Sequence, residues 1–227
     1  MDICDFHAHV LPGVDHGSLS LDVTLRQLTI ARRNGVKRIV ATSHFYPHKD
    51  TVESFLKRRD EAYHLLLPHL TEDMPEIRLG AEVLLCANLD GIADLDKLCI
   101  HGTKTILVEL PFNDFGSEYV HAIEGMLELG YEVILAHAEC YDPRNIDRLL
   151  SLGVLIQVNA SAYIPWFPKR VLKEWQSEGK IIAIGSDIHG PDKRAYKNFR
   201  RAIRRLRDYA LYIKEESDSI WDESTRK

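Results

Sequence analysis

Histidines gather near the start of this sequence in a pattern that is typical of a metal site. His7 and His9 stand two residues apart after an apolar lead, and His16 follows a Pro-Gly turn beside Asp15. In an extended strand, side chains two residues apart point to the same side, so His7 and His9 can reach one ion together. Imidazole nitrogens are common ligands of Mn, Fe and Zn in proteins.

Imidazole and carboxylate groups recur later in the chain, at or near the ends of short apolar runs. The full set of candidate ligands is His7, His9, His16, His44, Glu82, Glu109, His137, Asp187 and His189. Taken singly, His44 or His137 would be typical of a buried core histidine, so the indication comes from the set. Nine candidates exceed the coordination number of one ion, and a carboxylate such as Glu82 can bridge two. The sequence therefore predicts two or three ions.

Seven apolar runs rich in Ile, Val and Leu carry these residues. They are 3–7, 38–44, 77–85, 105–111, 132–138, 154–160 and 181–187. Nearly continuous apolar runs of this length are typical of parallel strands covered on both faces. The segments between them have helical spacing, and the last predicted helix extends from Tyr196 through Ala210. Repeated strand–helix order predicts an α/β fold with a parallel sheet, open or closed as a barrel. In both forms the carboxyl ends of the strands form the site.

Composition limits the class of protein. The 227 residues are 45% apolar, which is enough for one domain over residues 1–227. A formal net charge of −5 argues against nucleic acid as a partner. We do not expect the chain to be an integral membrane protein, because no apolar run is long enough to span a bilayer. Acidic residues near the start and cysteines without C-x-x-C spacing predict a cytoplasmic location.

The ordered motifs FHAH, TSH, GAE, VELP, LAHAE and SDIH resemble the PHP superfamily. Within it, HAHVLPGVDHG, TSHFYP, QVNASAY and SDIHG are most similar to the manganese-dependent tyrosine phosphatases of bacterial capsule and exopolysaccharide operons. The resemblance extends from Met1 to about residue 210. It implies the PHP fold, a distorted (β/α)7 TIM-like barrel.

The resemblance also implies how the ligands divide among three ions. His7, His9, Glu82 and Asp187 would hold the first ion, Glu82, Glu109 and His137 the second, and His16, His44 and His189 the third. Mn²⁺ is the implied cofactor, and Fe or Zn would suit the same ligand types.

Two positions depart from the pattern of this branch. His16 stands where the branch usually has a second Asp, and it remains a competent ligand. Cys140 stands where the branch usually has an arginine that binds phosphate, and a thiol cannot make that bidentate contact. Arg144 or Arg194 would supply the charge instead, and Arg194 matches a second arginine of the branch in rough position.

The implied reaction is phosphomonoester hydrolysis by a hydroxide that bridges two ions. Arg194 would stabilise the developing charge, and Asp15 is a candidate proton donor to the leaving group. Tyr163 and Trp166 are candidates for contact with a substrate phenyl ring, with local packing as the equal alternative. No cysteine begins a C-x5-R loop, so Cys140 is expected to be a rim or packing residue and not a nucleophile.

Three functions agree with these observations. The leading one is a protein-tyrosine phosphatase whose implied partner is a bacterial tyrosine kinase that controls polysaccharide export. A small-molecule phosphatase of the histidinol-phosphate kind is the first alternative. The second is a metal-binding pseudophosphatase that docks phosphoproteins without turnover, which Cys140 motivates.

Two segments near the end of the chain carry dense charge. Residues 193–207 include eight basic side chains, which predict a solvated helix face or a docking surface for an acidic phosphopeptide or lipid headgroups. The tail, about 213–227, is expected to be frayed or to make contacts between subunits of an oligomer.

Overall fold

The computed structural model describes residues 2–112, 115–164 and 169–223. Its strands are β1 (Asp5–Ala8), β2 (Arg38–Ala41), β3 (His44–Phe45), β4 (Glu76–Leu79), β5 (Glu82–Leu84), β6 (Thr105–Glu109), β7 (Glu132–Leu135), β8 (Leu155–Asn159) and β9 (Ile181–Gly185). Its α-helices are α1 (Leu21–Arg33), α2 (Val52–Leu66), α3 (Ser117–Glu128), α4 (Pro143–Leu150), α5 (Arg170–Ser177), α6 (Lys193–Leu206) and α7 (Tyr209–Glu223). Short 3-10 helices are η1 (Leu67–His69), η2 (Leu89–Gly91), η3 (Leu95–Leu98), η4 (Ala138–Cys140) and η5 (Ala160–Tyr163).

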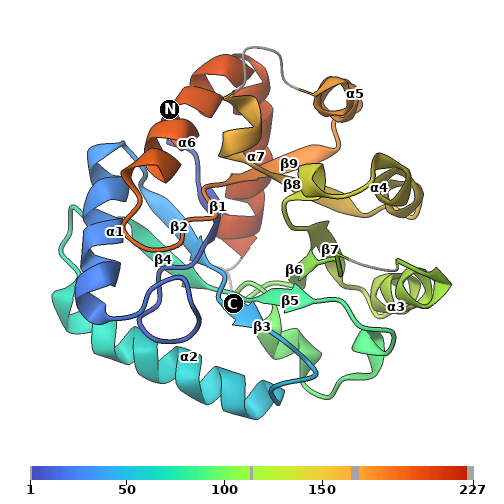
Figure 1. Cartoon of the computed structure of the whole chain (residues 1–227), viewed down its shortest axis with the longest axis horizontal. Coiled ribbons are helices and arrows are strands. Elements are labelled where there is room, and N and C mark those ends of the chain that lie inside the picture. The colour runs from blue at the N-terminus through green and yellow to red at the C-terminus, as the bar shows by residue number, and fades with distance from the viewer. Residues whose placement is uncertain (1, 113–114, 165–168, 224–227) are drawn as a thin grey trace.

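The strands form a parallel barrel with helices outside it (Figure 1). One sheet has the order β1-β2-β4, and the other has the order β3-β5-β6-β7-β8-β9. The two sheets join because β2 and β3 continue one another, as do β4 and β5, which leaves seven strand positions around the barrel. β9 lies against β1, where the Asp187 N–H donates to the His7 carbonyl at 2.8 Å. The predicted distorted (β/α)7 barrel is confirmed.

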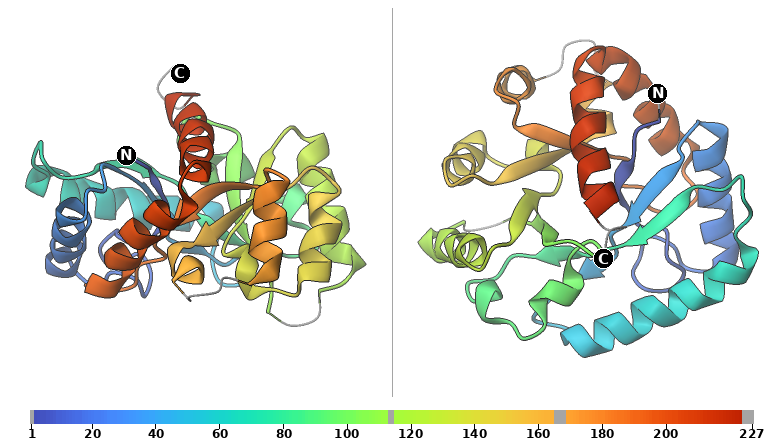
Figure 2. Two further views of the ribbon diagram at one scale, coloured as in Figure 1. Left: turned by 90° about the horizontal axis from the view of Figure 1, so that it is seen from above. Right: turned by 180° about the vertical axis from the view of Figure 1, so that it is seen from behind.

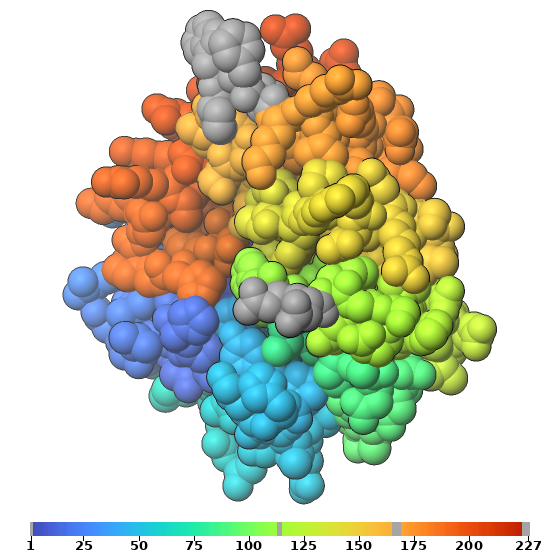
Figure 3. Space-filling view, turned by 45° about the vertical axis from the view of Figure 1, so that its right-hand side comes forward, coloured from blue at the N-terminus to red at the C-terminus, as the bar shows by residue number. Residues whose placement is uncertain are grey.

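The order of the chain around the barrel is visible from outside. In the space-filling view, the colours follow one another around the face from blue through green and yellow to orange (Figure 3). The crossover between β5 and β6 departs from the strand–helix alternation, because it contains η2 and η3 in place of an α-helix. The apolar runs are buried as predicted, and every residue of β6 and β9 is buried.

The end of the chain differs from its prediction. One helix from Tyr196 through Ala210 was expected, but α6 ends at Leu206 and Arg207 has a φ of 51°. α6 buries its apolar side against α1 and η5, whereas α7 turns away and packs against β9. The prediction of a frayed tail is wrong for residues 213–223, and residues 224–227 lie outside the described part.

α7 covers the end of the barrel where the strands begin (Figure 2). Its Ile220 and Trp221 join a buried cluster with residues of five strands, among them Phe6 of β1 and Leu107 of β6. Arg38 at the start of β2 pairs with Asp218 of α7. The carboxyl ends of the strands stay free of this cover. None of the described helices is both long and apolar enough to cross a membrane.

Replacing Trp221 with Ala should lower the free energy of unfolding by about 3 kcal/mol, because a buried aromatic side chain would leave a cavity. The ring is 5% exposed, and the guanidinium groups of Arg38 and Arg78 lie 5.5 and 5.0 Å from its centre. Urea denaturation measures the change. Leu211→Ala, in the same helix but half exposed, is the control and should change stability by no more than about 0.5 kcal/mol. Equal effects of the two substitutions would contradict the role of α7.

Candidate metal centre

The carboxyl ends of the strands bring the predicted ligands together. Glu109 ends β6, His44 and Glu82 begin the short second segments β3 and β5, and His137 and Asp187 follow β7 and β9. His7, His9, Glu82, Glu109 and His137 are buried, and His16, His44, Asp187 and His189 are partly or fully accessible. The parallel register pairs His44 with Glu82, so neighbouring strands deliver an imidazole and a carboxylate to the same level.

The four ligands predicted for the first ion converge. His7 Nε2 and His9 Nε2 lie 3.1 Å apart. Glu82 Oε2 is 3.2 Å from the first of these nitrogens and 3.3 Å from the second, and Asp187 Oδ1 is 3.7 and 3.6 Å from them. The four donor atoms are therefore close enough to share one cation.

The second predicted group is also assembled. His137 Nε2 lies 2.8 Å from Glu82 Oε1 and 3.7 Å from Glu109 Oε1. His44 joins this group, since its Nδ1 lies 2.9 Å from Glu82 Oε2 and 3.8 Å from Glu109 Oε2. The two oxygens of Glu82 thus face different imidazoles, which is the arrangement that a bridging carboxylate requires.

The third predicted group is looser. The ring of His16 lies 4.9 Å from that of His44 and 4.6 Å from that of His189, measured between centroids. The three imidazoles whose nitrogens lie within 4.8 Å of one another are, however, those of His9, His44 and His189. His9 and His44 therefore lie between predicted groups, and the assignment of His16 to the third ion stays a prediction.

A bound cation would satisfy several atoms that the protein leaves unpaired. Among the described residues, Nε2 of His189 is buried without a hydrogen-bond partner, and Nδ1 of His44 and Oε2 of Glu82 face each other at 2.9 Å without the geometry of a hydrogen bond. Such atoms cost free energy unless a water or ion satisfies them. Burial disfavours the imidazolium of His7, but Glu82 and Asp187 outweigh burial and raise its pKa to about 10. The centre thus attracts positive charge, and its imidazole and carboxylate donors suit Mn, Fe or Zn.

Asp15 contacts His9, a predicted ligand, and its role as proton donor to the leaving group stays a prediction. Its carboxylate accepts hydrogen bonds from His9 Nδ1 at 2.8 Å, the Gly17 N–H at 2.8 Å and the His44 N–H at 3.0 Å. Burial works to raise the pKa of Asp15, but these bonds hold it well below its ordinary value, so the group is ionised. The backbone at Gly17 lies against the side chain of His9. Only glycine fits there, because a Cβ at position 17 would lie 2.0 Å from Cβ of His9.

Two uncharged residues of β8, Gln157 and Asn159, form hydrogen bonds to candidate ligands. The sequence did not lead us to predict them. His7 Nδ1 donates to Gln157 Oε1 at 3.0 Å, which leaves Nε2 of His7 free to bind a cation. The same oxygen accepts from the His137 N–H. Gln157 Nε2 donates to Asn159, and Asn159 Nδ2 donates to Asp187 Oδ2 at 2.9 Å. The Q-x-N alternation, which places both amides on one side of the strand, was the available signal.

Two ligands have unusual backbone conformations. His137 has a φ of 34° and Asp187 a φ of 50°, in the left-handed region that non-glycine residues rarely adopt. Each stands two residues after the end of a strand, so the chain turns sharply where the ligand must face the centre. Strain of this kind clusters at functional sites, where the surrounding structure enforces it.

The arginines predicted to bind phosphate lie on the rim. Arg144 is exposed near the start of α4, and its guanidinium binds Asp142 at 2.6 Å. Arg194 is exposed near the start of α6, five residues after His189. Both helices begin on the side of the barrel where the ligands gather. Both arginines can therefore approach a substrate only from the edge of the centre.

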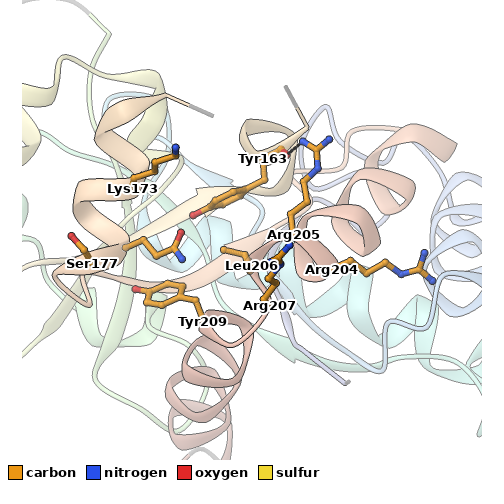
Figure 4. A pocket seen from close by; sticks show the side chains of 9 residues that line it. Tyr163, Lys173, Ser177, Arg204, Arg205, Leu206, Arg207 and Tyr209 are labelled. Carbon is orange, nitrogen blue, oxygen red and sulfur yellow. Dashed lines mark hydrogen bonds between the residues drawn. The ribbon is translucent and has the colours of Figure 1, made fainter. Parts of the chain in front are cut away.

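Tyr163, a candidate for contact with a substrate ring, stays a prediction in that role. It is buried and lines a cavity of about 980 Å³ between Lys173 of α5 and Arg205 of α6 (Figure 4). The residues that line this cavity include none of the nine candidate ligands. Local packing, the alternative considered for Tyr163, agrees with this position. Trp166 lies outside the described residues.

Comparison with known proteins finds bacterial tyrosine-protein phosphatases that are similar to most of the chain. It is similar to the tyrosine-protein phosphatase CpsB of Streptococcus pneumoniae, with 25% identity over 213 residues that cover 84% of each chain. It is 27% identical over 206 residues to the tyrosine-protein phosphatase YwqE of Bacillus subtilis (strain 168), covering 85% of this chain and 79% of the relative.

Solved structures support the fold. A chain from the structures of YwqE from Bacillus subtilis and CpsB from Streptococcus pneumoniae, described as metal-dependent tyrosine phosphatases, matches with a TM-score of 0.74. It is 20% identical, and the match covers 94% of this chain and 90% of that one. A β-aspartyl dipeptidase from Fervidobacterium islandicum AW-1 matches with a TM-score of 0.52 and 12% identity, over 96% of this chain and 74% of the other. Residues 3–216 match the family described as capsular polysaccharide synthesis, CpsB/CapC, and the chain therefore belongs to this family.

Proposed function

We propose that this chain is a metal-dependent tyrosine-protein phosphatase. The observation that carries the proposal is the convergence of imidazole nitrogens on both oxygens of the buried Glu82. Membership of the CpsB/CapC family adds the reaction, because relatives that cover most of the chain are tyrosine-protein phosphatases.

Different residues would bind the cations and the substrate. Bound divalent ions would lower the pKa of a bound water and neutralise phosphate charge. Asp15 keeps Nε2 of His9 directed at the centre, and Gln157 does the same for His7. Arg144 and Arg194 on the rim are the proposed cationic contacts to the phosphate, since Cys140 offers none.

Three finer assignments belong to the proposal. Mn²⁺ is the proposed cofactor, in two or three ions, because carboxylates accompany the imidazoles, and Fe or Zn would suit the same donors. The proposed substrate is a phosphotyrosine of a bacterial tyrosine kinase linked to polysaccharide export. The proposed location is the cytoplasm, where free thiols such as those of Cys4, Cys86, Cys99 and Cys140 persist.

A substrate panel tests the reaction. The protein purified with Mn²⁺ should hydrolyse a phosphotyrosine peptide in preference to the same peptide with phosphoserine and to histidinol phosphate. Chelation with EDTA should abolish turnover, and added Mn²⁺ should restore it. Preference for histidinol phosphate would favour a small-molecule phosphatase. Retained metal without turnover of any substrate would favour a pseudophosphatase.

Removing one ligand tests the centre. His137→Ala should lower kcat by about 100-fold or more and reduce the bound metal, because Nε2 of His137 faces Glu82 and Glu109. Phosphate release and metal analysis by mass spectrometry give the two readings. His121→Ala, an exposed histidine of α3, is the matched control and should keep both values. Wild-type turnover by His137→Ala would show that the metal assignment is wrong.

Asp15→Asn separates ligand orientation from proton donation. Loss of the charged partner of His9 should weaken metal affinity by about 10- to 100-fold, the usual cost of removing such a partner. Titration of the metal-free protein with Mn²⁺ measures the affinity, and Asp22→Asn, an exposed carboxylate of α1, serves as control. Unchanged affinity with reduced kcat would support the role of proton donor for Asp15.

A further inference from the structure

A small cavity of about 170 Å³ opens directly beside the metal centre. Two segments line it, one after β6 and one after β7. The lining includes Leu110, Phe112 and Phe115 from the first segment and Cys140, Tyr141 and Asp142 from the second. The first segment follows Glu109 and the second follows His137, so both walls continue from candidate ligands of the second ion.

Tyr141 lines this cavity and lies beside a candidate ligand. Its ring centre lies 5.5 Å from that of His137, and its hydroxyl accepts a hydrogen bond from the Leu110 N–H at 3.2 Å. This bond ties the two walls together and fixes the ring. The cavity therefore lies next to the centre, on the side of His137.

The cavity has the size and lining for one aromatic ring. A cavity of about 150 Å³ with apolar walls can hold benzene. The ring of Phe112 lies 5.6 Å from that of Tyr141, within the range of aromatic pairs, yet Phe112 is 72% exposed. A large aromatic side chain left open beside a site gains free energy when a ligand covers it.

Cys140 adds an uncharged side chain to the same wall. Burial, together with the charges of Glu139 and Asp187, raises the pKa of its thiol to about 11, so the group stays neutral near pH 7. An arginine at this position would place a charged group beside the ring site. Of the other lining residues, Leu110 and Tyr141 are uncharged, and the carboxylate of Asp142 is paired with the guanidinium of Arg144 at 2.6 Å.

We infer that this cavity binds the aryl ring of the substrate and makes the centre selective for aryl over alkyl phosphates. The inference rests on the proposed phosphatase function and names its specificity site. Phe112 and Tyr141 are ring contacts that the sequence-based prediction did not name. Phosphoserine lacks a ring and would leave the cavity unfilled.

Binding of phosphonates tests the cavity without turnover, because these compounds are not hydrolysed. Calorimetry on the Mn²⁺-loaded protein should show tighter binding of phenylphosphonate than of methylphosphonate. Phe112→Ala should reduce this ratio by about three- to tenfold, the usual range for loss of an aromatic contact. Phe112 is exposed, so the variant keeps the core intact. Leu65→Ala, an exposed side chain of α2, should leave the ratio unchanged.

Kinetics on the phosphotyrosine peptide give a second reading. KM should rise in Phe112→Ala while kcat stays constant, because the ring contact is the same in the ground and transition states. Equal binding of the two phosphonates by the wild type, or an unchanged ratio in Phe112→Ala, would overturn the inference. Selective, Phe112-dependent binding without hydrolysis of any phosphomonoester would support the aryl site and refute the proposed catalysis.

Discussion

The buried carboxylate of Glu82 is the interaction on which the centre depends. The residue is 1% exposed, and an ionised carboxylate in that position costs several kcal/mol unless positive charge compensates it. Its neighbours within 3.3 Å are imidazole nitrogens of His7, His9, His44 and His137. The coulombic and hydrogen-bonding contributions of these histidines keep the pKa of Glu82 low against the effect of burial. Protons or metal ions must supply the positive charge, and the donor set favours metal ions.

The irregularities of the barrel serve this same group of residues. Two strand positions are interrupted, and the second segments begin with His44 and with Glu82. Two further strands end in a turn at a ligand with positive φ, His137 and Asp187. A regular barrel would alternate these side chains between the interior and the helices. The breaks interrupt that alternation at the positions where a ligand must face inward. The distortion of the barrel therefore serves the geometry of the metal centre.

Much of the barrel and of its metal centre could be predicted, because the sequence indicates where the strands end. Apolar runs located the strands, and the ligand types located the rim, including Glu109 and Asp187. The sharing of His9 and His44 between groups could not be predicted, because it depends on ring orientation and loop paths. The same holds for Asp15, whose hydrogen bonds decide its charge. Helix α7 was missed although Ala210, Ile213, Ser217, Ile220 and Trp221 repeat at helical spacing, since the dense charge around them favoured a frayed tail.

The position of α7 separates the two tasks of the barrel in space. The amino ends of the strands are sealed by Ile220 and Trp221, whereas the carboxyl ends carry the ligands and the rim loops. The packing that stabilises the fold thus lies at one end of the barrel, and the candidate metal ligands lie at the other end. A rim position such as Cys140 can change its chemical character in evolution without disturbing the packing that holds the fold. A cysteine at this position, where the resemblance implies an arginine, is the kind of difference that such a division allows.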